Sequence, residues 1–170
     1  AGLWKGLKDL YAIGFIDKLP RLISAQAEGC CPLNRAIETG GDWKPMEENT
    51  LADSIAVGVP RNADKALMAI RESDGLVVNV SDEEIMAAQK LLGRTCGVFG
   101  EPAGVTGAAG VKKLCEAGVI GEDNTVVSVV TGNGLKDVAN AIKSCGEPIS
   151  IPSDMDRLLA AFAERRITVD

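Results

Sequence analysis

The 170-residue sequence contains no histidine. Histidine supplies the general base in Ser-His and Cys-His nucleophile pairs and many of the ligands in zinc sites. Its absence excludes all of these arrangements, so we expect no catalytic residue of this kind and no metal site. Any chemistry must use lysine, carboxylates, hydroxyls or a bound organic group.

Long apolar runs and an excess of positive charge are also lacking. The longest apolar stretches, such as 126–130 and 158–162, fall far short of the roughly 20 residues that span a bilayer. Lys and Arg number 18 against 24 Asp and Glu, and the resulting net charge of -6 repels phosphate backbones and anionic lipid surfaces. We therefore expect neither nucleic acid nor a membrane as a partner.

The five cysteines form no Cys-x-x-Cys pair, and this spacing predicts neither a disulfide framework nor a zinc site. Such usage favours a cytoplasmic, reducing location. We interpret the adjacent Cys30 and Cys31 as two buried thiols rather than a redox pair. The start at Ala1 has no charged segment followed by an apolar signal core, which is typical of a cut inside a longer chain or of a processed end.

Apolar periodicity predicts strands that alternate with helices. The strands expected over 21–27, 76–80 and 125–130 are nearly all apolar, which indicates a parallel sheet with helices on both faces. The fold class is therefore α/β, a three-layer sandwich forming a single domain over 1–170. Helices are predicted over 3–13, 32–39, 51–57, 63–73, 82–92, 105–118, 135–142 and 154–163, with N-caps at Thr50, Asn62, Ser81 and Ser153 and a C-terminal stop at Gly14.

Ligands of an open parallel sheet bind outside the carboxyl ends of its strands. The loops at 28–30, 80–82 and 131–134 follow predicted strands, and the loop at 101–104 is a fourth that could converge on them. The acidic residues 82–84 are interpreted as a solvated first helical turn.

Two residues in these loops are candidate ligand contacts. Thr131 ends an apolar strand and precedes Gly132, so its hydroxyl is able to form one hydrogen bond to a heteroaromatic nitrogen; the alternative is a cap or turn residue. Glu101 is able to orient a ligand or move a proton, and its alternative is a capping acid at a helix N-terminus. The pair Gly132 and Gly134 is too short for a dinucleotide-binding fingerprint.

The run Thr131-Gly132-Asn133-Gly134-Leu135-Lys136-Asp137 after an apolar strand, together with Glu101-Pro102-Ala103, resembles the end of threonine synthases. The opening run 3–11, Leu-Trp-Lys-Gly-Leu-Lys-Asp-Leu-Tyr, resembles the helix that follows the glycine-rich phosphate loop of that family. The runs at 26–29 and 81–85 also match, in the family's order.

The resemblance implies a fold type II, tryptophan synthase beta-like enzyme that uses pyridoxal phosphate to convert O-phospho-L-homoserine and water to L-threonine and phosphate. It places Thr131 and Gly132 at the pyridine nitrogen of the cofactor and Ser54 near the ring face. No lysine here lies in the family's Ser-x-Lys-Asp context, and the phosphate loop is expected just before Ala1. The chain would then be an inactive carboxy-terminal lobe of a two-lobed enzyme.

Two alternatives stay open. Within the same fold, the chain could belong to a related lyase such as threonine dehydratase or cysteate synthase, although 135–137 favours the synthase. In another class, it would be a non-catalytic domain that binds a small phosphate ligand or pairs with a subunit carrying the lysine. In every case we expect an exposed apolar face and association into a homo-oligomer.

Overall fold

A computed structural model describes residues 1–146, 150–151 and 153–164. Helices surround a parallel pair of strands, β1 (Ile23–Ala27) and β2 (Leu76–Val80). The register runs from Ile23 opposite Leu76 to Ala27 opposite Val80, so both strands end at the same edge. The helical elements are α1 (Gly2–Ala12), α2 (Pro32–Thr39), η1 (Asp53–Ile55), α3 (Ala63–Glu72), α4 (Asp82–Cys96), α5 (Pro102–Glu116), η2 (Gly134–Lys136), α6 (Val138–Cys145) and α7 (Met155–Glu164).

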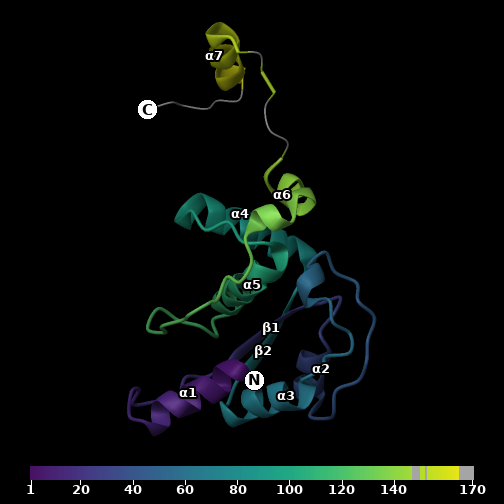
Figure 1. The fold of residues 1–170 in the computed structure, drawn as a ribbon, viewed down its shortest axis with the longest axis vertical. Helices are drawn as coiled ribbons and strands as arrows, with labels where there is room; N and C mark the ends of the chain where they lie inside the picture. The colour runs from purple at the N-terminus through teal and green to yellow at the C-terminus, as the bar shows by residue number, and fades with distance from the viewer. Residues whose placement is uncertain (147–149, 152, 165–170) are drawn as a thin grey trace.

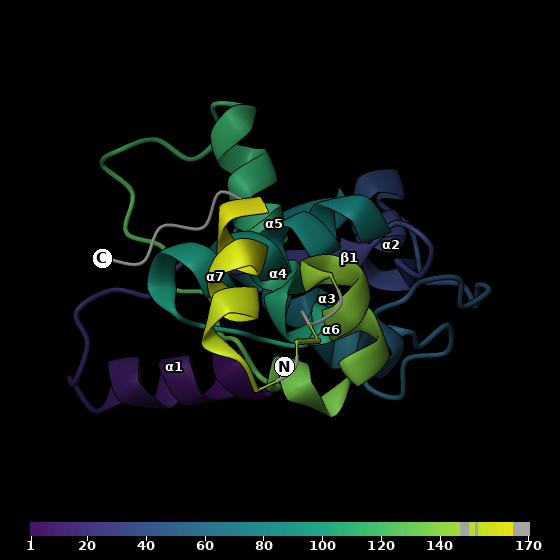
Figure 2. The same cartoon turned by 90° about the horizontal axis from the view of Figure 1, so that it is seen from above.

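The strands lie between two layers of helices, as Figure 1 shows. Helix α5 packs on both strands from one side, and α4 packs on α5. Helix α2 packs on the strands from the other side, with α3 against it. The view from above in Figure 2 shows α4 and α6 near each other, and these two helices are in contact. The predicted α/β class, with a parallel sheet covered on both faces, is confirmed.

Local sequence signals set several of these elements correctly. Helix α4 begins with the predicted capping box, in which Glu84 N–H donates to Ser81 Oγ at 3.2 Å and Ser81 N–H donates to the Glu84 carboxylate at 2.7 Å. Beyond α1, Gly14 has a φ of +72°, a conformation that glycine adopts without steric cost. Helix α2 starts with Pro32 in its first turn and stops at the left-handed Gly40, also as predicted.

The third predicted strand is wrong. Residues 125–130 form no strand, and Val127 and Val129 are 85% and 64% exposed. The segment runs along α5, where a Cβ on Gly107 would lie 2.9 Å from Ser128 Oγ. Strand geometry requires a neighbour that completes the hydrogen-bond ladder, and in the described part of the chain none lies beside this segment.

Several helix ends also differ from the prediction, and α4 continues to Cys96 instead of ending near Leu92. Helix α5 begins inside the predicted loop, because Pro102 at its first position tolerates the missing N–H. The helix predicted over 51–57 shrinks to the single turn η1. The one predicted over 135–142 divides into η2 and α6, since the Asp137 side chain caps the second part. Helix α7 is capped by Asp154, whose carboxylate accepts from Arg157 N–H at 2.9 Å, rather than by Ser153.

The hydrophobic core lies where β1 and β2 meet α4 and α5. Its fully buried members include Ala27, Val80, Ile85 and Val105. Small residues on α5 bring that helix close to the strands. Among the described residues, no helix has the length and apolar character needed to cross a bilayer.

Candidate functional site

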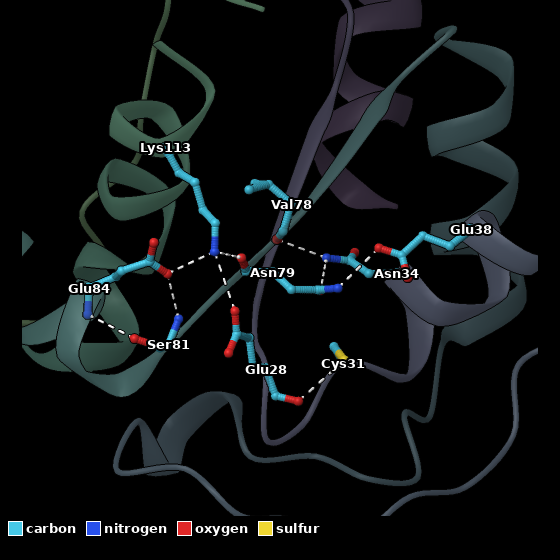
Figure 3. Close-up of polar contacts among 9 residues, drawn as sticks. All are labelled: Glu28, Cys31, Asn34, Glu38, Val78, Asn79, Ser81, Glu84 and Lys113. Atoms are coloured by element: carbon cyan, nitrogen blue, oxygen red, sulfur yellow. Dashed lines mark hydrogen bonds and ion pairs between the residues drawn. The ribbon is translucent and has the colours of Figure 1, made fainter. Parts of the chain in front are cut away.

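The carboxyl ends of β1 and β2 are joined by an ion cluster. Lys113 on α5 places its Nζ 2.9 Å from the Glu84 carboxylate, 2.9 Å from the Asn79 carbonyl oxygen and 3.3 Å from the Glu28 carboxylate (Figure 3). Hydrogen bonds to the Glu84 and Glu28 carboxylates outweigh desolvation and raise the pKa of Lys113. Burial alone would raise the pKa of Glu84, but the Ser81 N–H and Lys113 outweigh it and the net pKa is lowered. The cluster ties both strand ends to α4 and α5.

A buried amide performs the same task on the other face of the strands. Asn34 on α2 is fully buried, and its Nδ2 lies 2.9 Å from the Val78 carbonyl oxygen, 2.7 Å from Asn79 Oδ1 and 3.2 Å from the Ser24 carbonyl oxygen. Its Oδ1 accepts from Ser24 Oγ at 2.7 Å. Figure 3 shows the side chain pointing from α2 toward the strands. Asn34 therefore fixes α2 to both strands.

The loop after β1 is closely packed. A Cβ on Gly29 would overlap the Asn49 carbonyl oxygen, so the chain passes too close for any side chain there. Cys30 and Cys31 are both free and buried, which confirms the interpretation as neighbouring buried thiols. Burial raises the pKa of both thiols, and this disfavours the reactive thiolate.

The first turn of α4 is not simply solvated, as the sequence suggested. The Asp82 carboxylate accepts from Thr50 Oγ at 2.5 Å and from Leu51 N–H at 3.0 Å. These bonds hold the segment that leads into η1 against the start of α4. An aspartate in a helix's first turn is so common on dipole grounds that the sequence carries no separate signal for this role.

The loops at 99–104 and 131–134 interlock. Glu101 N–H donates to the Gly132 carbonyl oxygen at 2.9 Å, and Gly134 N–H donates to the Phe99 carbonyl oxygen at 2.8 Å. A Cβ on Gly132 would overlap the Glu101 carboxylate. Of the three loops on which the loop at 101–104 could converge, the one at 131–134 is thus in contact with it, and a side chain at Gly132 would displace the Glu101 carboxylate.

Glu101 does not act as a capping acid. It stands at the N-cap position of α5 without a side-chain cap hydrogen bond, and its carboxylate lies 3.1 Å from Lys136 Nζ. The carboxylate is almost fully buried whereas the lysine is largely exposed. This pair crosses over Gly132 and reinforces the junction between the two loops.

Thr131 and Gly132 lie together at this junction. The Thr131 side chain is exposed, and in the described part of the chain its hydroxyl forms no hydrogen bond. The turn that follows is capped instead by Asn133, whose Oδ1 accepts from Leu135 N–H at 2.9 Å. The exposed Thr131 hydroxyl is therefore available for a hydrogen bond to a ligand.

Ser54 lies elsewhere, exposed in η1. Its Oγ donates to the Asp53 carboxylate at 3.0 Å. No hydrogen bond joins it to Thr131 or Gly132 within the residues that the structure describes, although η1 packs on α5. The three residues predicted to contact the cofactor thus remain a prediction, with two of them adjacent and the third on a separate element.

Comparison with known proteins places the chain in a family. Residues 1–132 match the family model described as "Pyridoxal-phosphate dependent enzyme". The chain therefore belongs to the family of pyridoxal-phosphate-dependent enzymes, and this confirms the cofactor that the sequence predicted.

Within that family, the similar proteins are threonine synthases. The chain is 45% identical to the threonine synthase of Methanosarcina acetivorans over 94% of its own length and 44% identical to that of Methanocaldococcus jannaschii over 96%. The threonine synthase of Mycobacterium tuberculosis is 39% identical over 89% of the chain. The chain spans only 40% or 41% of the length of these relatives. The resemblance to threonine synthases is confirmed.

A solved structure agrees on the fold. Maize serine racemase superposes with a TM-score of 0.60, covering 92% of this chain and 43% of the racemase, at 18% sequence identity. At that identity the match supports the fold type II architecture alone.

Proposed function

We propose that this chain is the carboxy-terminal lobe of a threonine synthase, which converts O-phospho-L-homoserine and water to L-threonine and phosphate. The observation that carries the proposal is the junction formed by Thr131 and Gly132 with Glu101, in a chain that is 45% identical to a threonine synthase. The same architecture serves threonine dehydratase and cysteate synthase, which remain the alternatives within the fold.

Pyridoxal phosphate, when bound, supplies an electron sink for negative charge that develops on the amino-acid substrate. In this proposal the Thr131 hydroxyl holds the pyridine nitrogen. A neutral hydroxyl, unlike a carboxylate, does not stabilise a protonated ring nitrogen, so the sink is moderated. Gly132 would lie beside the ring, with its own side-chain position filled by the Glu101 carboxylate, and Ser54 would face the ring.

The remaining residues of the site orient these contacts. The Glu101 to Lys136 ion pair and the two backbone hydrogen bonds between the loops keep Thr131 in place. The Schiff-base lysine is proposed to come from a segment outside these 170 residues, because no lysine here stands in the Ser-x-Lys-Asp context. On this view the isolated chain binds cofactor weakly and does not turn over substrate.

The proposal is tested by complementation. The chain is mixed with the amino-terminal part of the Methanosarcina acetivorans threonine synthase that precedes the matched region. Two signals are measured: phosphate release from O-phosphohomoserine and the visible absorbance of the protein-bound cofactor. We expect both signals only with both parts, a changed absorbance in Thr131→Ala, and no change in the control Thr125→Ala, which alters an exposed threonine of the same segment.

Other results would redirect the assignment. Turnover of threonine to 2-oxobutyrate, or of phosphoserine with sulfite, in place of phosphohomoserine would favour the dehydratase or cysteate synthase. Binding of pyridoxal phosphate without turnover of any of these substrates, although both parts are folded, would favour the non-catalytic domain.

A further inference from the structure

A polar side chain lies in the core directly beneath the predicted cofactor junction. Gln89 on α4 is fully buried, and its Nε2 donates to the Gly100 carbonyl oxygen at 2.8 Å. Within the described residues its Oε1 has no hydrogen-bond partner. Burying an amide with one end unsatisfied costs free energy, so a buried glutamine at this position calls for an explanation. Its neighbours Ile85 and Ala88 on the same helix are apolar.

The carbonyl that Gln89 contacts belongs to the backbone that bridges the two loops. Gly100 lies opposite Asn133 in an antiparallel bridge, flanked by the hydrogen bonds from Glu101 N–H and Gly134 N–H. A Cβ on Gly100 would lie 2.5 Å from Val130 Cγ1, so the bridge packs too closely for a side chain at this position. Gln89 is thus one hydrogen bond away from the bridge, and the bridge is next to Thr131.

We infer that Gln89 is a positioning residue for the cofactor site. Its amide sets the distance between Gly100 and α4. Because Gly100 is hydrogen-bonded through the bridge to the loop at 131–134, this distance also sets the position of Gly132 and of the Thr131 hydroxyl. Gln89 touches neither cofactor nor substrate. The inference rests on the proposed function, since it assigns the Thr131 segment to the cofactor.

The first arm of the test measures the bridge in the full 170-residue chain. Gln89→Met keeps the length and burial of the side chain but removes the donor. Ile85→Val is the matched control, one turn earlier on α4, equally buried and without a polar contact to the loops. Amide hydrogen exchange is followed at Glu101 and Gly134 relative to Ala109 inside α5. Loss of a buried donor predicts exchange at the bridge faster by about fivefold or more in Gln89→Met, and no such selective change in Ile85→Val.

The second arm measures the cofactor in the complemented enzyme. We expect Gln89→Met to weaken the affinity for pyridoxal phosphate by about tenfold, the effect of roughly one lost hydrogen bond, and to shift the absorbance of the bound cofactor as Thr131→Ala does. Ile85→Val should change neither quantity, even where it lowers the melting temperature as much. Should Gln89→Met fail to fold, Gln89→Asn, which is one methylene too short to reach Gly100, must reproduce the selective loosening.

The outcomes separate this inference from the proposed function. If exchange at the bridge rises no more in Gln89→Met than in Ile85→Val, Gln89 does not hold the junction and the inference is overturned. If Thr131→Ala weakens cofactor binding but Gln89→Met does not, the inference alone fails. If neither variant alters binding, the role proposed for Thr131 is wrong and the inference falls with it.

Discussion

Replacing Asn34 should destabilise the chain more than any surface change, because this amide connects α2 to both strands. Asn34→Leu keeps the branched shape and the number of side-chain heavy atoms but removes the donor that serves the Val78 and Ser24 carbonyl oxygens. Losing one hydrogen bond costs about 0.5–1.5 kcal/mol, so the four side-chain hydrogen bonds of Asn34 together predict a loss of about 2–6 kcal/mol. That is a large share of the roughly 5–15 kcal/mol by which a domain is stable.

Urea unfolding followed by circular dichroism measures this loss, provided that the dependence of the unfolding free energy on urea concentration stays constant. Thr39→Ala, an exposed position on the same helix, is the control and should change stability by no more than about 0.5 kcal/mol. Asn34→Asp, which has the same shape but presents an oxygen to the three acceptors, should be at least as destabilising as Asn34→Leu. A loss below about 1 kcal/mol in both Asn34 variants would refute the reasoning, since the lost hydrogen bonds together should cost at least about 2 kcal/mol.

Three further predictions concern charge, thiols and the unpaired segment. Because the pKa of Glu84 is lowered in the folded chain, its ion pair stabilises the fold above the ordinary pKa of 4.5, and this contribution is lost as the pH falls through the lower folded value. Glu84→Gln should therefore reduce the fall of the urea midpoint below about pH 4.5. A midpoint that falls as steeply as in the unchanged chain would contradict the ion cluster. Iodoacetamide labelling with mass spectrometry should modify Cys96, Cys115 and Cys145 rapidly and Cys30 and Cys31 only on unfolding, and early labelling of either buried thiol would be inconsistent with the structure. Val127→Lys should change the unfolding free energy by less than about 0.5 kcal/mol, because the side chain is 85% exposed. It should also reduce self-association, measured by sedimentation velocity, more than the control Val119→Lys does. A much larger destabilisation would mean that Val127 is buried.

Local signals in the sequence predicted the elements whose determinants are themselves local. The capping box at Ser81 and the glycines after α1 and α2 act within a few residues, and they mark these helix ends in the structure. The apolar runs ending at Ala27 and Val80 pair with each other, and the alternation of strand and helix made that parallel pairing predictable.

The irregular conformation of residues 125–130 was not predictable in the same way. The valines of this segment have the composition of a buried strand, but whether they form one depends on a neighbouring strand, which composition does not reveal. The junction was half predictable. Thr131 and Glu101 stood out by their loops, whereas Gln89, Lys113 and Asn34 act through contacts with residues 11, 29 and 44 positions away. No spacing rule links a helix residue to such partners.

The close approach of α5 to the strands has a mechanical consequence. A Cβ on Gly110 would lie 2.7 Å from Val78 Cγ1 and 3.0 Å from the Ala25 Cβ, so the helix packs on the strands here with no room for a side chain. Glu101 precedes Gly110 by nine residues, a distance of roughly 13 Å along the helix at 1.5 Å per residue. A methyl group added at Gly110 must displace either these two side chains or α5 itself, and any movement of α5 would also move Glu101. The position of the Glu101 carboxylate therefore depends on a residue that does not contact it.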